Sequence, residues 1–172
     1  YMSLRIAQAM VRSYGDEQAP AGRMLAELDR EAPFDSDLRS ARAAWMNARG
    51  WHLRAESELL TLLQEDPTFV SARTGLAKTE LALQRYRETE RDLYALTAHY
   101  PESKAVQLLQ RQWEIHNMRE LDVTGGLGRG SGGVLGNNDF ALQALLYSSP
   151  LAYNYRVFAR SYEAYADFNG TH

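Results

Sequence analysis

Cysteine, long apolar runs and a large surplus of one charge are all missing from this sequence. No cysteine occurs among its 172 residues, which excludes disulfide bonds and thiol chemistry. No segment reaches the roughly 18 consecutive apolar residues of a membrane-spanning helix, so no such helix is expected. The formal net charge is only −3, which does not favour nucleic acid as a partner. In residues 1–118, 15 basic and 17 acidic side chains are interspersed, a pattern typical of solvated helix surfaces.

Side-chain arrangements that usually carry catalysis or bind metals are missing as well. His52, His99, His116 and His172 show no metal-ligand spacing, so no metal site is expected. The glycine-rich residues 125–133 are not followed by Gly-Lys-Ser/Thr or by an expected helix, so a loop is predicted rather than a phosphate site. No serine lies in a glycine-elbow context and no pair of acids stands out. We therefore expect a non-enzymatic protein without a cofactor.

What the sequence does contain is a repeat in its first two thirds, marked by evenly spaced prolines at Pro33, Pro67 and Pro101. Other residues recur at the interval that separates these prolines: Arg5, Arg39 and Arg73; Ala9, Ala43 and Ala77; Leu25, Leu59 and Leu93; Leu28, Leu62 and Leu96. This period and these residue types are typical of tetratricopeptide repeats, helical hairpins that each need a neighbour to bury their apolar side. An array of such hairpins forms a curved binding scaffold.

The residues within each repeat explain why it would fold as two helices. The alanines of the first helices face Ala21 and Ala55 of the second helices, which lets the helices approach closely. The paired leucines lie three positions apart, on one helical face. Each proline forces the residue before it out of helical geometry and ends its unit. Gly50 suits the turn inside the second repeat, whereas Asp16 and Gln84 at the equivalent positions predict less typical turns.

One further helix is predicted at residues 104–118, as a cap over the last full repeat. We therefore assign residues 1–118 to about three tetratricopeptide repeats and this capping helix. Trp45 and Trp113 are separated by twice the period and occupy equivalent places on two first helices. Both are expected to pack between hairpins.

The composition changes at about residue 119, where we place a domain boundary. Eight of the twelve glycines lie after this boundary, and the apolar pattern changes from helical periodicity to alternation. Alternation predicts three strands, at residues 121–127, 140–147 and 155–168. A long glycine-rich loop and a short turn, residues 129–138 and 148–154, are expected between them. We assign residues 119–172 to these strands.

The predicted strands are long enough to cross an outer membrane when tilted, which takes about 9–11 residues. With the helices in the periplasm, the long loop would be extracellular and the short turn periplasmic. Tyr147, Tyr153 and Tyr155 would then lie at one membrane edge, where aromatic rings are favoured. In the third strand, charged and aromatic side chains share both faces unless a bulge shifts the register. A soluble three-stranded sheet and a disordered glycine-rich tail are the alternatives.

Three strands are too few for a barrel, which needs at least about eight. Because the sheet would keep two unpaired edges, we expect it to be flexible or to self-associate. The sequence shows neither a signal peptide at its start nor a closing segment at its end, so we expect a piece of a longer exported protein. The motif Asn169-Gly170-Thr171 matches a glycosylation acceptor but is expected to form a turn.

The order of these modules resembles a known family. Repeats ending at Pro33, Pro67 and Pro101, then residues 139–147 (DFALQALLY) and 146–156 (LYSSPLAYNYR), resemble the poly-β-1,6-N-acetyl-D-glucosamine export porins. The resemblance implies a mainly α fold: a tetratricopeptide superhelix followed by antiparallel strands of a truncated outer-membrane β-barrel. It also implies periplasmic repeats that receive the partly de-N-acetylated polysaccharide, beside its deacetylase, and guide it to the pore. The cellulose exporter and phage-adsorption outer-membrane proteins share this plan.

Residues on the first helix of each hairpin are expected to line the concave groove and bind the polysaccharide. Their hydrogen-bonding groups suit sugar hydroxyls and acetamides, and Tyr14 is suited to stacking on a pyranose. Free amines would instead favour the carboxylates of Asp16, Glu17 and Asp37. The alternative for each residue is plain solvated surface. The predicted groove consists of Tyr14, Asp16, Glu17, Asp37, Asn47, Thr74, Lys78 and His116.

Two other classes of function fit the same sequence. The repeats would serve equally as a protein-interaction adaptor, for example in another outer-membrane exporter. A clamp for peptide tails is disfavoured, because only Asn47 and Lys78 approach the basic and asparagine side chains that such clamps need. A soluble sensor, whose sheet is not part of a membrane protein, is the third class.

Overall fold

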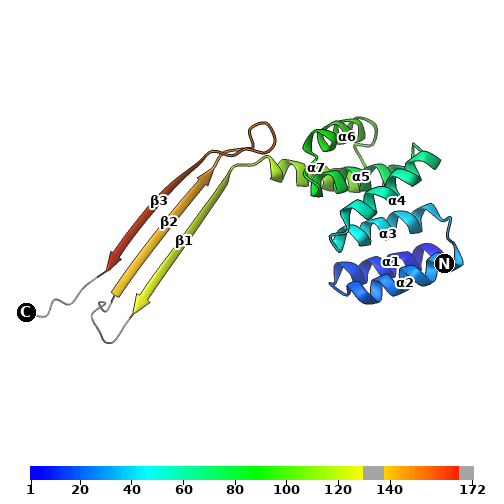
Figure 1. The fold of residues 1–172 in the computed structure, drawn as a ribbon, viewed down its shortest axis with the longest axis horizontal. Coiled ribbons are helices and arrows are strands. Elements are labelled where there is room, and N and C mark those ends of the chain that lie inside the picture. The colour runs from blue at the N-terminus through cyan, green and yellow to red at the C-terminus, as the bar shows by residue number, and fades with distance from the viewer. Residues whose placement is uncertain (130–137, 167–172) are drawn as a thin grey trace, which may run out of the picture. The chain divides into compact units, whose positions relative to one another are not determined.

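The chain folds as two compact units, Tyr1–Trp113 and Glu114–His172. The computed structural model describes residues 1–129 and 138–166. In this described part, the first unit is helical and the second contains one three-stranded sheet (Figure 1). None of the helices in the described ranges combines the length and the apolar character that crossing a membrane requires.

The first unit consists of helical hairpins, as the period of the repeat predicts. The helices of the described residues are α1 (Met2–Tyr14), α2 (Gln18–Glu31), α3 (Ser36–Ala48), α4 (His52–Glu65), α5 (Val70–Ala82), α6 (Tyr86–His99) and α7 (Lys104–His116). The last helix ends at His116 and not at the predicted residue 118. The N–H groups of Asn117 and Met118 bond instead to carbonyl oxygens three positions back, at 3.1 Å each, which tightens the chain into a turn.

The prolines end the hairpins as predicted. The residues that precede them, Ala32, Asp66 and Tyr100, have φ angles of −145°, −137° and −133°, far from helical values. The amide N–H of each still bonds to the carbonyl oxygen four positions earlier, at 2.8–2.9 Å, which satisfies one of the last helical acceptors. Each second helix therefore closes at the same place in the repeat.

The turns inside the three hairpins are alike, although their sequences differ. Asp16, Gly50 and Gln84 occupy equivalent positions and have φ angles of 65°, 75° and 61°. The less typical turns expected at Asp16 and Gln84 are thus not observed. Both residues adopt the left-handed conformation that costs glycine little, since the packing of the hairpin requires it.

Alanines and leucines form the core of the helical unit in three clusters. Ala9, Ala43 and Ala77 are fully buried, and the repeated leucines are at most 6% exposed. One cluster joins α1, α2 and α3, the next joins α3, α4 and α5, and the third joins α5, α6 and α7. Each hairpin is therefore completed by the first helix of its neighbour. Val106 and Leu109 of α7 complete the third cluster, as expected of a capping helix.

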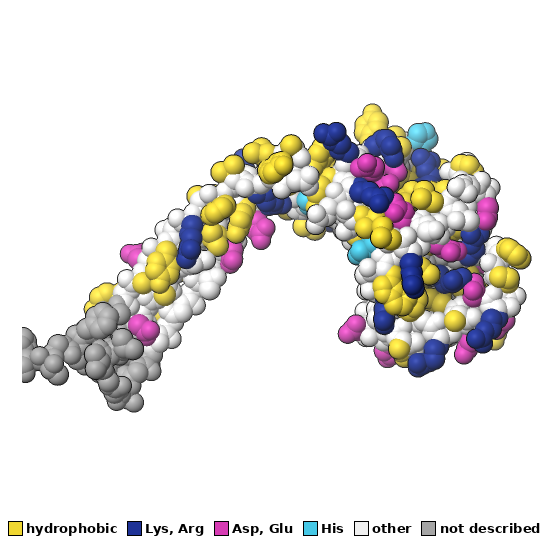
Figure 2. Space-filling view, in the orientation of Figure 1, with side chains coloured by type: hydrophobic (Ala, Val, Ile, Leu, Met, Phe, Trp, Pro, Cys, Tyr) yellow, Lys and Arg dark blue, Asp and Glu magenta, His cyan; other side chains and the backbone are white. Residues whose placement is uncertain are grey.

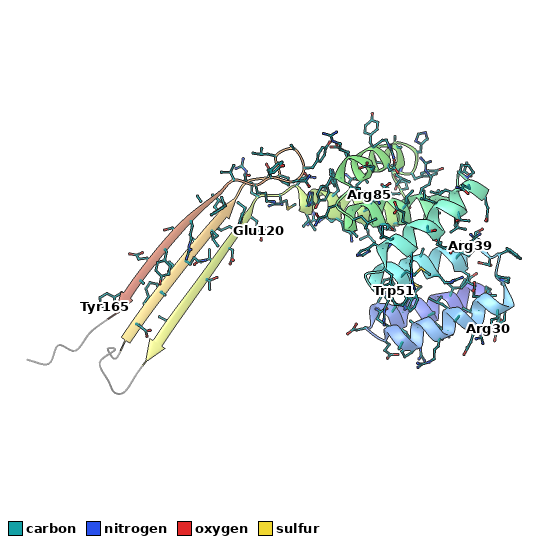
Figure 3. The ribbon with its side chains drawn as sticks, in the orientation of Figure 1. Arg30, Arg39, Trp51, Arg85, Glu120 and Tyr165 are labelled. Atoms are coloured by element: carbon teal, nitrogen blue, oxygen red, sulfur yellow. The ribbon has the colours of Figure 1, made fainter. Side chains whose placement is uncertain are left out.

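Two of the three repeated arginines, Arg5 and Arg39, link the two helices of a hairpin through ion pairs. Arg5 Nη1 lies 2.6 Å from a carboxylate oxygen of Glu31, and Arg39 Nη1 lies 2.6 Å from one of Glu65. Figure 3 labels Arg39 on its helix. Arg39 also donates from Nε to Glu58 at 2.9 Å. The side-chain hydrogen bond that Arg39 donates to Glu58 is the main cause that raises the pKa of Arg39. The spacing of Arg5 and Arg39 thus reflects a contact that recurs in the first two hairpins.

The two tryptophans at equivalent positions pack between hairpins, as predicted. Trp45 of α3 donates from Nε1 to the carbonyl oxygen of Gln18 in α2 at 3.0 Å. Its ring lies so close to Gly22 that a Cβ there would be 2.5 Å from it. Trp113 of α7 packs against the third core cluster.

The second unit contains an antiparallel sheet in the order β1 (Glu120–Arg129), β2 (Asn138–Tyr147) and β3 (Phe158–Ala166). In the described residues the sheet is open and does not close into a barrel. Partners directly opposite each other point to the same side. The apolar face of β1 and β2 consists of Leu121, Val123, Leu127, Phe140, Leu142, Ala144 and Leu146. The other face carries the polar residues Asp122, Thr124, Gln143 and Arg160 together with Leu145, Tyr147, Phe158 and Tyr162. The alternation predicted for the first two strands is confirmed.

The third strand differs from its prediction. It begins at Phe158 and not at Tyr155, because Leu151 and Tyr155 pair with each other in a small turn, with N···O distances of 2.7 and 3.0 Å. The predicted short turn at residues 148–154 is therefore extended to Val157. The β2–β3 register runs without a bulge through the described pairs, and Glu163 lies opposite Leu142 on the apolar face. The mixed faces predicted for this strand are thus present.

The loop predicted at residues 125–133 is wrong in its first part, because β1 continues through Arg129. Asn138, placed in the predicted long loop, starts β2. The rest of that loop lies outside the described residues. So do residues 167–172, which include the end of the predicted third strand and the Asn169-Gly170-Thr171 motif.

Candidate functional site

Equivalent positions of the repeats form a cavity in the helical unit. Residues spaced by the period converge on it: Met10, Ala44 and Lys78; Ser40 and Thr74; Ser13, Asn47 and Leu81; Tyr14, Ala48 and Ala82. The volume of the cavity is about 540 Å³. Its other lining residues are His52, Ser71, Gly75, Ala105 and Gln112. Helices α1, α3 and α5 therefore contribute the same face, and the capping helix α7 adds to one end.

Half of the predicted groove residues line this cavity. They are Tyr14, Asn47, Thr74 and Lys78. Asp16 and Glu17 lie in the exposed turn between α1 and α2, and Asp37 is exposed in the first turn of α3. None of these three carboxylates is among the lining residues. His116 ends α7 and belongs to the second unit.

Asn47 is held in place by neighbouring side chains. Its Nδ2 donates to Thr79 Oγ1 at 2.7 Å, and its Oδ1 lies 3.0 Å from His52 Nδ1. Thr79 in turn donates to the Gly75 carbonyl oxygen at 2.8 Å. The Asn47 amide thus links α3 to α5 and fixes the wall of the cavity, with both of its polar ends engaged in the protein.

Thr74 and Lys78 present polar groups that the described protein does not satisfy. Thr74 is only 2% exposed, and its Oγ1 has no hydrogen-bond partner among the described residues. Lys78 is half-buried, and burial lowers the pKa of its ammonium group. An unsatisfied buried polar group costs free energy, which a ligand can recover by hydrogen bonding. These two side chains are the groups best placed to bind a ligand polar atom.

Several lining residues were not predicted from the sequence. They are Met10, Ser13, Ser40, Ala44, His52, Ser71 and Gln112 among others. A signal for some of them was present, since Ser40 precedes Thr74 by one period, and Ala44 and Met10 precede Lys78 by one and two periods. Gln112 of the capping helix likewise follows Lys78 by one period, whereas His52 comes from a second helix, which the first-helix rule does not cover. In the described ranges no group of three or more His, Asp or Glu side chains is arranged to hold a metal ion.

Comparisons with known proteins found a matching family model and two relatives by sequence, and similar solved structures by fold. Residues 115–172 match the family described as the PgaA membrane beta barrel domain. Over 150 residues, the chain is 31% identical to the poly-beta-1,6-N-acetyl-D-glucosamine export protein of Escherichia coli (strain K12) and to that of Escherichia coli O157:H7. The match covers 87% of this chain and 19% of the relatives, so the chain spans about a fifth of their length. The resemblance to this export family is confirmed.

Solved structures establish the fold of the helical part. The first TPR domain of human RPAP3 superimposes with a TM-score of 0.55 at 14% identity, covering 66% of this chain and 90% of that chain. The Arabidopsis OM64 TPR domain gives 0.54 at 16% identity, covering 67% and 95%. The predicted tetratricopeptide fold is therefore confirmed. The matched proteins are described as an export protein and as repeat domains, not as enzymes, which agrees with the predicted non-enzymatic character.

Proposed function

We propose that this chain, a relative of the poly-β-1,6-N-acetyl-D-glucosamine export proteins, is part of an outer-membrane polysaccharide exporter. Its helical unit binds the polysaccharide in the periplasm, and its sheet is the beginning of the barrel through which the polymer leaves. The observation that carries this proposal is the cavity built from equivalent positions of α1, α3 and α5, in a chain whose other part matches a membrane barrel family.

The cavity has the size and lining of a small-ligand site. A volume of about 540 Å³ lies within the usual range of ligand pockets and leaves room for a sugar unit. Apolar side chains such as Met10 and Leu81 suit the faces of a pyranose ring, and Tyr14 offers an exposed aromatic ring at the edge. Because the repeats present the same face in succession, several weak contacts along one polymer would add up. Such contacts hold a chain while still letting it move.

The two faces of the sheet suit a barrel wall. Leu121, Val123 and Leu127 of the apolar face are 64%, 58% and 84% exposed. Figure 2 shows hydrophobic side chains at the surface of the sheet unit. Exposed apolar side chains in a row are costly in water and are stable against lipid. The opposite face carries Arg160, whose Nη2 donates to Gln143 Oε1 at 2.8 Å, and suits a hydrated lumen. In this arrangement the helical unit lies in the periplasm.

Calorimetric titration of the 172-residue chain with β-1,6-linked N-acetylglucosamine oligomers tests the binding step. Tyr14→Ala is expected to weaken binding by about threefold to tenfold, because an aromatic contact contributes roughly 0.5–1.5 kcal/mol. Tyr94→Ala is the matched control: both tyrosines are 79% exposed, but Tyr94 lies on α6 and does not line the cavity. Equal affinities of the two variants would contradict the proposed site.

Partition into lipid vesicles tests the membrane assignment of the sheet. Val123→Lys places a charge on the apolar face, where it would cost about 2–4 kcal/mol at the centre of a membrane. Thr124→Lys places the same charge on the polar face of the same strand. We expect the first change to reduce vesicle-bound protein by at least about tenfold and the second to have little effect. Equal partition of both variants would argue for a soluble sheet.

A protein partner is the second candidate for the helical unit. The solved neighbours include the first TPR of Spaghetti (RPAP3) bound to an HSP90 peptide, so this fold accommodates peptides in that protein. By the family resemblance, the partner here would be the periplasmic polysaccharide deacetylase. Co-purification of the deacetylase with the chain, unaffected by saturating sugar oligomers, would favour this adaptor function over direct polymer binding.

A further inference from the structure

We propose that the cavity selects N-acetylated sugar units over units that carry a free amine. This inference rests on the proposed polysaccharide binding and specifies the chemical form of the sugar that the site takes. The residues that make the selection are Thr74 and Lys78, four positions apart on the same face of α5.

The lining of the cavity contains no carboxylate in the described part of the chain. Among the described lining residues, Lys78 is the one lysine or arginine. Asp16, Glu17 and Asp37, the expected partners for free amines, lie elsewhere on the surface. A protonated sugar amine would therefore enter without a counter-charge and close to an ammonium group, which is unfavourable in a partly desolvated site.

The ammonium group of Lys78 can only donate and therefore requires an acceptor atom, whereas the Thr74 hydroxyl can donate or accept. The Asn47 amide is already bonded to Thr79 and His52. Thr74 Oγ1 is buried without a hydrogen-bond partner, and Lys78 forms no ion pair within the described ranges. Three ammonium protons and one hydroxyl proton are thus available on one helical face. A protonated amine has no acceptor to offer the ammonium group of Lys78.

The acetamide group of a neutral N-acetyl sugar offers an acceptor atom and an apolar group, and both suit the lining of the cavity. Its carbonyl oxygen can accept from Lys78 and Thr74, and its methyl group can pack against the apolar lining, such as Ala44 and Leu81. A peptide carboxylate is a stronger acceptor, but removing it from water requires several donors or cations in return. A single lysine cannot fully compensate the desolvation of a carboxylate. A neutral carbonyl group loses less on leaving water, so one lysine suffices for it.

The two lysines of the sequence, Lys78 and Lys104, provide a matched test. The 172-residue chain is titrated at about pH 6, where free amines are protonated, with the N-acetylated β-1,6 oligomer and with its de-N-acetylated form. We expect the acetylated oligomer to bind at least about tenfold more tightly. Lys78→Glu should invert this preference, because it replaces the cation of the cavity by a carboxylate. Lys104→Glu changes the charge outside the cavity and should leave the ratio unchanged.

A second readout uses the unaltered sequence, since Lys78→Glu can impair folding. Reductive methylation with ¹³C labels both lysines, keeps their charge and yields separate NMR signals. The acetylated oligomer should shift the Lys78 signal and leave the Lys104 signal in place. If the oligomer binds but shifts neither lysine signal, the assignment of Lys78 to the binding site is overturned.

The outcomes separate this inference from the proposed function. Equal binding of both oligomers, or a ratio that Lys78→Glu does not change, overturns the selection but leaves polysaccharide binding standing. Failure of both oligomers to bind overturns both. Tighter binding of a peptide with an acidic C-terminus, lost in Lys78→Glu, would identify a carboxylate as the occupant and also overturn the inference.

Discussion

The helical unit and the sheet use the same apolar residue types in opposite ways. In the helical unit the repeated leucines are nearly inaccessible, and Leu62 is 1% exposed. In the sheet, Leu127 is 84% exposed and Tyr165 is 63% exposed. The helices contact neighbours that bury their apolar faces, whereas the sheet has no second layer in the described residues. A repeat array thus supplies its own core, but a strand of a barrel wall depends on its surroundings.

The largest effect on stability is expected when leucine is replaced by alanine in the helical unit, and the same substitution in the sheet is its comparison. Leu62→Ala should lower the free energy of unfolding of the helical unit by about 2–5 kcal/mol, because it opens a cavity beside Leu59 and Leu76. Leu127→Ala in the sheet should change the free energy of unfolding of the helical unit by less than about 0.5 kcal/mol. Urea unfolding followed by tryptophan fluorescence measures this directly, since all three tryptophans lie in residues 1–113. Equal effects would show that the two units fold as one.

A second difference concerns a buried acid, which makes the stability of the helical unit depend on pH. Glu80 is 6% exposed, and burial, followed by the charge of Asp92, raises its pKa from 4.5 to about 7. The unfolded chain therefore releases this proton at lower pH than the folded chain. The free energy of unfolding should fall as pH rises from about 4.5 to about 7 and then level off.

Glu80→Gln should remove that fall and stabilise the helical unit at about pH 8 by roughly 1–3 kcal/mol. Glu163→Gln, which changes an exposed carboxylate of the sheet, is the control and should leave the tryptophan-detected unfolding unaffected. The measurement is urea unfolding across this pH range. A wild-type curve without the fall would contradict the buried, protonated state of Glu80.

An effect of similar size is expected from adding one methyl group at Gly22 in the helical unit, and the smallest effect from adding one at Gly126 in the sheet. A Cβ at Gly22 would lie 2.5 Å from Trp45, so Gly22→Ala should destabilise the helical unit by about 1–3 kcal/mol. At Gly126 nothing lies within 4 Å of the added atom, and alanine there should be neutral or slightly favourable to the strand. Thermal unfolding by circular dichroism compares the two. A neutral Gly22→Ala would show that Trp45 moves aside easily.

Patterns with a fixed period were the predictable part of this fold. The interval between Pro33 and Pro67 predicted the hairpins, and alternation predicted β1 and β2, because both patterns depend on helix and strand geometry alone. The start of β3 was not predictable in this way. The contact between Leu151 and Tyr155 forms a turn that no alternation signals.

The candidate site was predictable only in part, for a related reason. Tyr14, Asn47, Thr74 and Lys78 line the cavity because they lie on first helices at positions that the period makes equivalent. The acids expected to bind amines do not line it, since turn geometry and helix phase place them on the exposed surface. Ser40 and Gln112 were missed although each lies one period from a predicted residue, Thr74 and Lys78, whereas His52 required knowledge of which second helix closes the cavity.

The repeat array and the alternating strands could be predicted from the order of the residues, because period and residue type set local geometry. The set of charged groups in the cavity, the unsatisfied hydroxyl of Thr74 and the burial of Glu80 became apparent from the packing of the helices. Solvation and hydrogen bonding of a side chain depend on neighbours that lie far away along the chain, and a local pattern does not contain them.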